Sequence, residues 1–129
     1  MPSRFLSKRV LLAIHRDLID TFGGAHGLRD GAALDSALSQ PEATFGGKPL
    51  HPSLEEQAAA YLFHLCQAHP FVDGNKRVAL AAADVFLRFN SRRLTLSDDD
   101  AYDLTIRVAR GEAGKDDVSA VFRASVEPS

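Results

Sequence analysis

A chain of 129 residues is long enough to bury one hydrophobic core, so we expect a single domain over residues 1–129. Its 45% hydrophobic and 25% charged residues are typical of a soluble globular protein, and no apolar stretch reaches the length of a signal peptide or a membrane span. The net charge of −2 excludes a global field that would draw the chain onto nucleic acid or an anionic membrane. The lone cysteine, Cys66, cannot form an internal disulfide, which fits a cytoplasmic protein.

The first half of the chain predicts two helices and a connection. Ser7 is placed to cap a helix over residues 8–22, whose apolar residues recur at helical spacing and which two glycines end. Asp30 is placed to cap a second helix over residues 31–39. Residues 41–52 hold three prolines and two glycines, which predict an irregular, extended connection.

The second half predicts four more helices. A Ser-x-x-Glu capping box at Ser53 predicts a helix over residues 54–68. Residues 76–89 are apolar almost all round, which indicates a central, buried helix. Capping and spacing predict two further helices over residues 98–110 and 115–124, and no segment alternates as a strand should. We therefore expect an all-α bundle of about six helices.

The loop between the two central helices carries the chemistry. Residues 69–77 read His-Pro-Phe-Val-Asp-Gly-Asn-Lys-Arg and run directly into the apolar helix. His69 is the one side chain there whose ordinary pKa lies near neutrality, so it can take a proton from an attacking hydroxyl. Asp73 is a hard oxygen ligand suited to a Mg²⁺ that also holds phosphate oxygens.

The remaining motif residues suit a phosphate. Gly74 allows the backbone to approach a ligand closely, and Asn75 can donate an amide hydrogen bond. Lys76 and Arg77 stand in the first helical turn, where free backbone N–H groups already favour an anion. Phosphoryl transfer needs positioning and charge stabilisation, which these groups supply.

Each motif residue alone has an ordinary structural explanation, such as a solvated histidine or a helix cap. Chance does not explain all seven chemically meaningful positions together. If each residue type occurs at roughly 5%, the probability that all seven match at a given starting position is about 10⁻⁹. Phe71 is expected to insert into the core and fix the loop.

This motif resembles the signature of the Fic/Doc family, His-x-Phe-x-Asp/Glu-Gly-Asn-x-Arg. The resemblance to the death-on-curing (Doc) branch extends to residues 27–30, 37–47 and 78–90. It implies a helical fold with the motif loop between two central helices. It also implies His69 as the base, Asp73 as the metal ligand, and Gly74, Asn75, Lys76 and Arg77 as the nucleotide phosphate ligands, with ATP and Mg²⁺ as cofactors.

Lys76 decides between the activities known in the family. Fic proteins that transfer AMP typically have glycine at this position, whereas Doc-type proteins have lysine and transfer the γ-phosphate. The resemblance therefore implies a protein Ser/Thr kinase that modifies elongation factor Tu and arrests translation. The alternatives are AMP transfer to a protein hydroxyl and a non-catalytic module that binds a nucleotide or an antitoxin.

Control is expected to come from another protein. The inhibitory Ser/Thr-x-x-x-Glu-Gly/Asn string of many Fic proteins does not occur in this sequence. The resemblance implies a small antitoxin whose disordered tail folds on binding, with no direct nucleic-acid or membrane partner.

Two other features of the sequence suggest functions. Gly46-Gly47-Lys48 lacks the first glycine and the final Ser/Thr of a P-loop. Residues 45–50 either align a target peptide, as the equivalent segment does in Fic proteins, or form a surface linker. A nuclease built on His69, Asp73 and Asn75 is disfavoured by the acidic charge balance.

Overall fold

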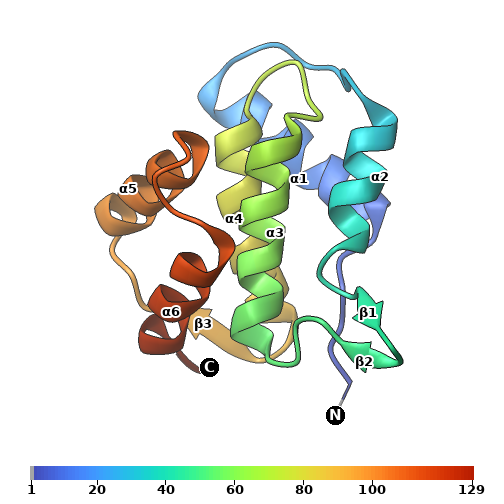
Figure 1. The fold of residues 1–129 in the computed structure, drawn as a ribbon. Helices are drawn as coiled ribbons and strands as arrows, with labels where there is room; N and C mark the ends of the chain where they lie inside the picture. The colour runs from blue at the N-terminus through green and yellow to red at the C-terminus, as the bar shows by residue number, and fades with distance from the viewer. Residues whose placement is uncertain (1) are drawn as a thin grey trace.

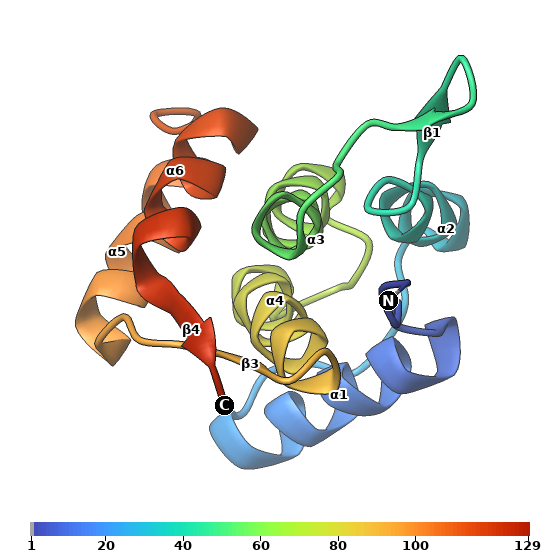
Figure 2. The same ribbon diagram turned by 90° about the horizontal axis from the view of Figure 1, so that it is seen from below.

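Two central helices organise the structure, a computed structural model that describes residues 2–129. Helices α3 (Leu54–Ala68) and α4 (Asn75–Phe89) lie side by side in the middle of the molecule (Figure 1). Seen end on, α1 (Lys8–Phe22) and α2 (Gly31–Ser39) cover one side of this pair, and α5 (Asp98–Ala109) and α6 (Lys115–Ser125) cover the other (Figure 2). The predicted all-α fold with six helices is confirmed for the described residues.

Side-chain caps explain where four of the helices begin. The side-chain oxygens of Ser7, Asp30, Ser53 and Ser97 each accept a hydrogen bond from the backbone N–H three residues later. Such a bond satisfies one of the otherwise unpaired N–H groups of a first helical turn. The predicted helix starts are confirmed at these positions.

The core lies between α3 and α4. Both helices bring alanines to their shared interface, and small side chains allow close packing. Around them the large fully buried side chains include Tyr61, Leu65 and Phe86. Asp84 and Arg88, the two charged residues that interrupt the apolar sequence of α4, lie one turn apart and form an ion pair of 3.3 Å. Among residues 2–129, no helix combines the length and the apolar character that crossing a membrane requires.

The predicted irregular connection over residues 41–52 was wrong in part. It contains a small hairpin in which β1 (Thr44–Phe45) pairs antiparallel with β2 (Lys48–Pro49). Gly46 and Gly47 both have positive φ, +59° and +79°, as a two-residue hairpin turn of the favoured hand requires. The two glycines therefore form a hairpin turn within a segment that was predicted to be irregular throughout.

A second small sheet was also not predicted. Strand β3 (Arg92–Leu94), directly after α4, pairs antiparallel with β4 (Val126–Pro128) near the end of the chain. Thr95 extends this contact through hydrogen bonds from its backbone N–H and its hydroxyl to the carbonyl of Ser125. The sheet fastens the C-terminal segment beneath the central helices (Figure 2).

Candidate active site

Two loops meet at one end of the central helices. The motif loop joins α3 to α4, and the segment between α1 and α2 crosses the same end (Figure 1). Backbone hydrogen bonds fasten them together: Arg29 N–H and Asp30 N–H donate to the carbonyl of Pro70, and Val72 N–H donates to the carbonyl of Gly27. The stretch 27–30 therefore supports the motif loop.

His69 ends α3 with its side chain exposed. Its backbone is left-handed, with φ +46° and ψ +53°, which strains any residue other than glycine. Arg29 stabilises this turn, because its guanidinium donates to the carbonyls of His69 and Ala68. The imidazole of His69 can consequently be reached by a large molecule from solvent.

Phe71 anchors the middle of the loop, as predicted. Its side chain is 2% exposed and stacks on the imidazole of His15 from α1, with ring centroids 3.7 Å apart. His15 Nε2 lies 2.8 Å from the carbonyl oxygen of Asp73, and since a carbonyl can only accept, His15 donates here. His15 thus holds the loop at two points, a role that sequence reasoning missed.

The carboxylate of Asp73 is fixed by backbone donors from both loops. Gly74 N–H donates to Asp73 Oδ1 at 2.9 Å, and Ala25 N–H donates to Asp73 Oδ2 at 3.2 Å. The side chain remains exposed, so its other lone pairs face solvent. Within residues 2–129 no group of three or more acidic, histidine or cysteine side chains is placed to hold a metal ion. A single hard carboxylate fits a Mg²⁺ that takes its other ligands from phosphate and water.

The first turn of α4 offers unpaired backbone donors. Gly74 stands at the N-cap in a left-handed conformation, φ +77°, and makes no side-chain cap bond. The N–H groups of the following turn are therefore available to an anion. The geometry also requires glycine, because a Cβ at residue 74 would lie 3.1 Å from Ile19 Cδ1.

Asn75 holds the loop from within. Its Oδ1 accepts a hydrogen bond from Phe71 N–H at 2.9 Å, and its Nδ2 donates to the carbonyl of Phe71 at 3.0 Å. One amide hydrogen of Nδ2 is left over. The structural role of Asn75 was not predicted, and its role as a phosphate ligand stays a prediction.

Lys76 and Arg77 are exposed on the same turn. The guanidinium of Arg77 lies 4.6 Å from the ring centroid of Phe22, which steadies it toward α1. The positive charge of Lys76 also acts on Cys66, near the end of α3. Burial raises the pKa of the Cys66 thiol, Lys76 partly opposes this rise, and the resulting pKa is about 11. Cys66 is therefore a buried thiol rather than a nucleophile.

The predicted phosphate and metal residues share one cleft. A cavity of about 230 Å³ lies between the start of α4 and helix α5. Its lining comprises the motif residues Asp73, Gly74, Asn75, Lys76 and Arg77 together with Leu80, Tyr102, Thr105 and Ile106. His69, at the other end of the loop, is not among the lining residues. The cleft can thus hold an anion beside a metal, with the candidate base outside it.

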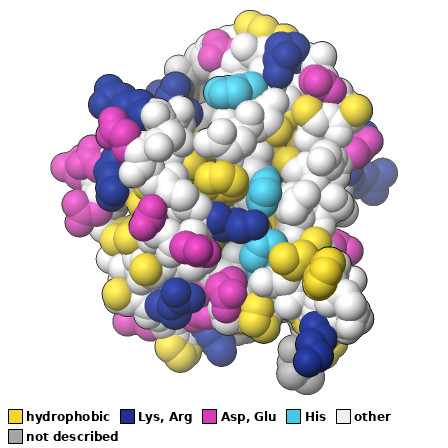
Figure 3. All heavy atoms as spheres, viewed as in Figure 1, with side chains coloured by type: hydrophobic (Ala, Val, Ile, Leu, Met, Phe, Trp, Pro, Cys, Tyr) yellow, Lys and Arg dark blue, Asp and Glu magenta, His cyan; other side chains and the backbone are white. Residues whose placement is uncertain are grey.

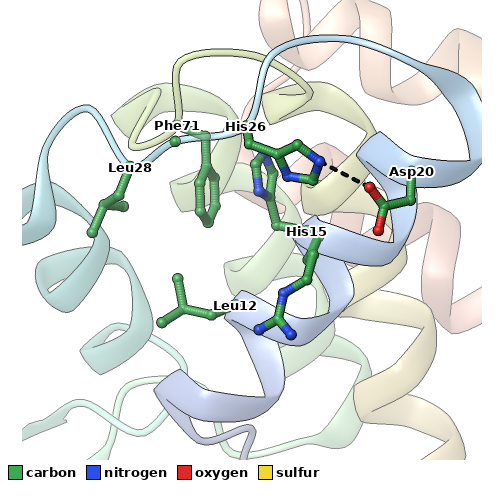
Figure 4. Close-up of a pocket in the computed structure, with 8 residues that line it drawn as sticks. Leu12, His15, Asp20, His26, Leu28 and Phe71 are labelled. Atoms are coloured by element: carbon green, nitrogen blue, oxygen red, sulfur yellow. Dashed lines mark hydrogen bonds and ion pairs between the residues drawn. The ribbon is translucent and has the colours of Figure 1, made fainter.

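A second hollow lies on the other side of Phe71. It has a volume of about 440 Å³ and opens between α1 and the segment before α2, where His26 and Asp20 form an exposed pair of 2.8 Å (Figure 4). His15 and Phe71 line it as well. Both side chains are almost fully buried, so they form only the floor of this hollow.

The sequence matches known proteins over most of its length. A family model described as the Fic/DOC family matches residues 5–87. The "Toxin Doc" of Mycolicibacterium smegmatis is 42% identical over 101 residues, which cover 77% of this chain and 78% of that protein. The "Protein kinase doc" of Escherichia phage P1 is 32% identical over 120 residues, which cover 93% of this chain and 94% of that protein.

Proposed function

This chain belongs to the Fic/DOC family, and we propose that it is a Doc-type toxin that transfers the γ-phosphate of ATP to a protein hydroxyl. The observation that carries the proposal is Lys76, which lies in the first turn of α4 on the wall of the cleft. A lysine there adds a bulky positive charge beside free backbone N–H groups, so it favours the end of the nucleotide with the most phosphate charge. The "Protein kinase doc" of phage P1 supports the same reading.

The mechanism assigns one task to each end of the loop. His69 accepts the proton of the target hydroxyl while the hydroxyl oxygen attacks the γ-phosphorus, and ADP leaves. Asp73 would hold Mg²⁺, which neutralises phosphate charge when it is bound. The N–H groups after Gly74, with Lys76 and Arg77, hold the phosphate oxygens. The exposed position of His69 suits a base that must meet a second protein.

Replacing His69 by alanine tests the mechanism. Because removing a general base costs about 10²- to 10⁴-fold in rate, His69→Ala should lose phosphate transfer. It should keep its fold, since the side chain is exposed and the turn is held by Arg29 through backbone carbonyls. Transfer rates and a urea unfolding curve measured on the same preparation check both parts. Full transfer by His69→Ala would remove this residue from the mechanism.

For the target, we propose elongation factor Tu, modified on a threonine so that translation stops. The hairpin of β1 and β2 offers a docking surface away from the site, because it lies at the end of the central helices opposite the motif loop (Figure 1). Phe45 at its tip is 82% exposed, and the short strands leave edges free for a target protein. Incubation with Mg²⁺ and ATP followed by mass spectrometry of elongation factor Tu tests this target. An unmodified factor beside an active enzyme would exclude it.

We also propose control by a small antitoxin whose tail folds onto this chain. The relative from Mycolicibacterium smegmatis carries the name of a toxin, and a toxin requires such control. Expression of this chain alone should stop growth, and co-expression of its antitoxin should restore it. Normal growth with folded, nucleotide-binding protein present would contradict the toxin assignment.

Two alternatives use the same residues. Nucleotidyl transfer would employ His69 as the base and the same backbone donors for the α-phosphate. A non-catalytic module would bind the nucleotide without transfer. Calorimetry with ATP and Mg²⁺ together with a transfer assay separates the module from either enzyme.

A further inference from the structure

The peptide unit that joins Asp73 to Gly74 is held at both of its polar ends. Its carbonyl oxygen accepts a hydrogen bond from His15 Nε2 at 2.8 Å, and its N–H donates to Asp73 Oδ1 at 2.9 Å. Because the peptide is planar and trans, its C=O and N–H point in opposite directions, so fixing one direction also fixes the other. The carbonyl of Asp73 therefore points toward α1, and the N–H of Gly74 points away from α1 toward the carboxylate.

Gly74 leaves this peptide free to turn over. It has φ +77°, and a rotation of the peptide by half a turn would bring φ to negative values, which glycine adopts about as readily. After that rotation the N–H of Gly74 would no longer face Asp73 Oδ1, and the carboxylate would keep only its bond from the N–H of Ala25. The glycine that the turn requires thus does not determine the orientation of the peptide, and another group has to do so.

The imidazole of His15 is placed to determine this orientation. Its side chain is 4% exposed, lies on the buried face of α1 one turn before Ile19, and stacks on Phe71. A Cβ at Gly74 would lie 3.6 Å from His15 Nε2 and 3.1 Å from Ile19 Cδ1, so α1 packs closely beneath the peptide. Because a buried donor is costly to leave unpaired, His15 favours the one orientation in which the carbonyl of Asp73 faces it.

We propose that His15 is a positioning residue, which holds the carbonyl of Asp73 and thereby keeps the peptide in the orientation that presents the Asp73 carboxylate to a metal ion. This rests on the proposed function, which requires Mg²⁺ at Asp73. His15 does not line the cleft of the phosphate residues, so it acts through the peptide and not on the ligand. Its effect should be confined to the metal, because the anion-binding N–H groups of residues 75–77 lie beyond this peptide.

Two substitutions separate the hydrogen bond from the packing. His15→Phe keeps a flat ring on Phe71 but cannot donate, whereas His15→Gln keeps an N–H donor but loses the ring. Calorimetry measures the binding of inorganic tripolyphosphate with and without Mg²⁺. Because an unpaired buried carbonyl shifts an equilibrium about fivefold or more, His15→Phe should reduce the gain in affinity from Mg²⁺ by that factor. Its metal-free affinity should stay within about twofold of the wild type, and His15→Gln should keep most of the gain.

A second readout uses the metal-free protein and does not depend on catalysis. Hydrogen exchange of the Gly74 amide, followed by NMR, should be faster in His15→Phe, because the turned peptide no longer donates to Asp73 Oδ1. His15→Gln should exchange as the wild type does. In the double variant of His15→Phe with Asp73→Ala, the Mg²⁺ response should match that of Asp73→Ala alone, since His15 acts through Asp73.

Three results would overturn the role of His15, and they differ in what they say of the proposed function. An equal gain from Mg²⁺ in the wild type and His15→Phe would show that the hydrogen bond does not position the carboxylate, while the proposed function stands. Loss of the metal-free affinity as well would show that His15 merely supports the fold of the loop. Failure of the wild type to bind tripolyphosphate with or without Mg²⁺ would remove the phosphate site itself, and the proposed function with it.

Discussion

Asp73 is held against the segment that follows α1, and Gly24 is the residue that permits this approach. A Cβ at Gly24 would lie 2.7 Å from Asp73 Oδ2, closer than real side chains approach, and 3.2 Å from Ile19 Cδ1, a tight contact. The next residue, Ala25, donates its N–H to the same carboxylate oxygen. The position of the candidate metal ligand thus depends on a glycine outside the motif.

Gly24→Ala should therefore displace the carboxylate of Asp73 and raise the Mg²⁺ concentration needed for half-maximal activity. Gly23→Ala is the matched control, because Gly23 also has positive φ, +89°, but a Cβ there would meet nothing within 4 Å. Both variants should lose about 1–3 kcal/mol of the free energy of unfolding through backbone strain. Only Gly24→Ala should raise the Mg²⁺ concentration for half-maximal activity. If both variants need the same concentration, the close contact between Gly24 and Asp73 does not matter for metal binding.

The motif residues could be predicted because they adjoin one another in the sequence. Residues 73–77 line the same cleft because all of them lie at the start of α4. The residues that hold them could not be predicted in the same way. His15 is 58 residues from Asp73, and Arg29 is 40 residues from His69. In the sequence each is an isolated polar residue, and only the packing of α1 and the following segment on the loop reveals its task.

The hairpin of β1 and β2 exposes an aromatic side chain at the end of the central helices opposite the motif loop (Figure 1). Phe45 is 82% exposed, and the turn of Gly46 and Gly47 projects away from α2 (Figure 2). An aromatic side chain this exposed contributes little to folding. We therefore predict that Phe45 belongs to a surface that becomes buried when a partner binds.

Phe45→Ser should raise the KM for the target protein about five- to thirtyfold, the effect of losing an aromatic contact worth about 1–2 kcal/mol. The KM for ATP should not change, because Phe45 is remote from the residues that line the cleft. Stability should stay within about 0.5 kcal/mol of the wild type. Steady-state kinetics with each substrate varied in turn measure this; an unchanged KM for the target would make the hairpin a linker.

Helices and strands differ here in how far the sequence determines them. Each of the four helices with a side-chain cap begins where Ser7, Asp30, Ser53 or Ser97 predicts, because the capping bond is local. The strands are two or three residues long, too short to show alternation. Strand β3 pairs with a segment about 34 residues away, and the chain between them forms α5 and α6.

The packing of α3 on α6 brings basic groups together. Lys115 Nζ, at the start of α6, lies 3.2 Å from His64 Nε2 of α3. In the space-filling view, histidine side chains flank a Lys or Arg side chain on this face (Figure 3). Burial, and after it the nearby Lys115 and His51, together lower the pKa of His64 to about 4. Burial, followed by Lys115, also lowers the pKa of His51, while Glu56 opposes this.

Stability should consequently fall as the pH is lowered from about 6.5 to about 4. In this window His64 of the unfolded chain binds a proton, since its ordinary pKa is 6.5, while the folded protein keeps it neutral. The unfolded state thus holds more protons, and protonation favours it. Urea midpoints across this range measure the effect.

His64→Gln is the control for this pH dependence, because glutamine still accepts a hydrogen bond from Lys115 but does not titrate. The variant should lose less stability than the wild type between pH 6.5 and 4. An identical pH profile for the two proteins would show that His64 is not the group responsible.

The molecule as a whole brings a base, a carboxylate and free backbone donors to one end of its central helices, and the central claim is that this end transfers the γ-phosphate of ATP. The most direct test incubates the purified protein with Mg²⁺, elongation factor Tu and ATP labelled at either the α- or the γ-phosphate. Transfer of label from the γ position alone, abolished in His69→Ala, is the predicted result. Label arriving from the α position would establish nucleotidyl transfer and contradict the role given to Lys76.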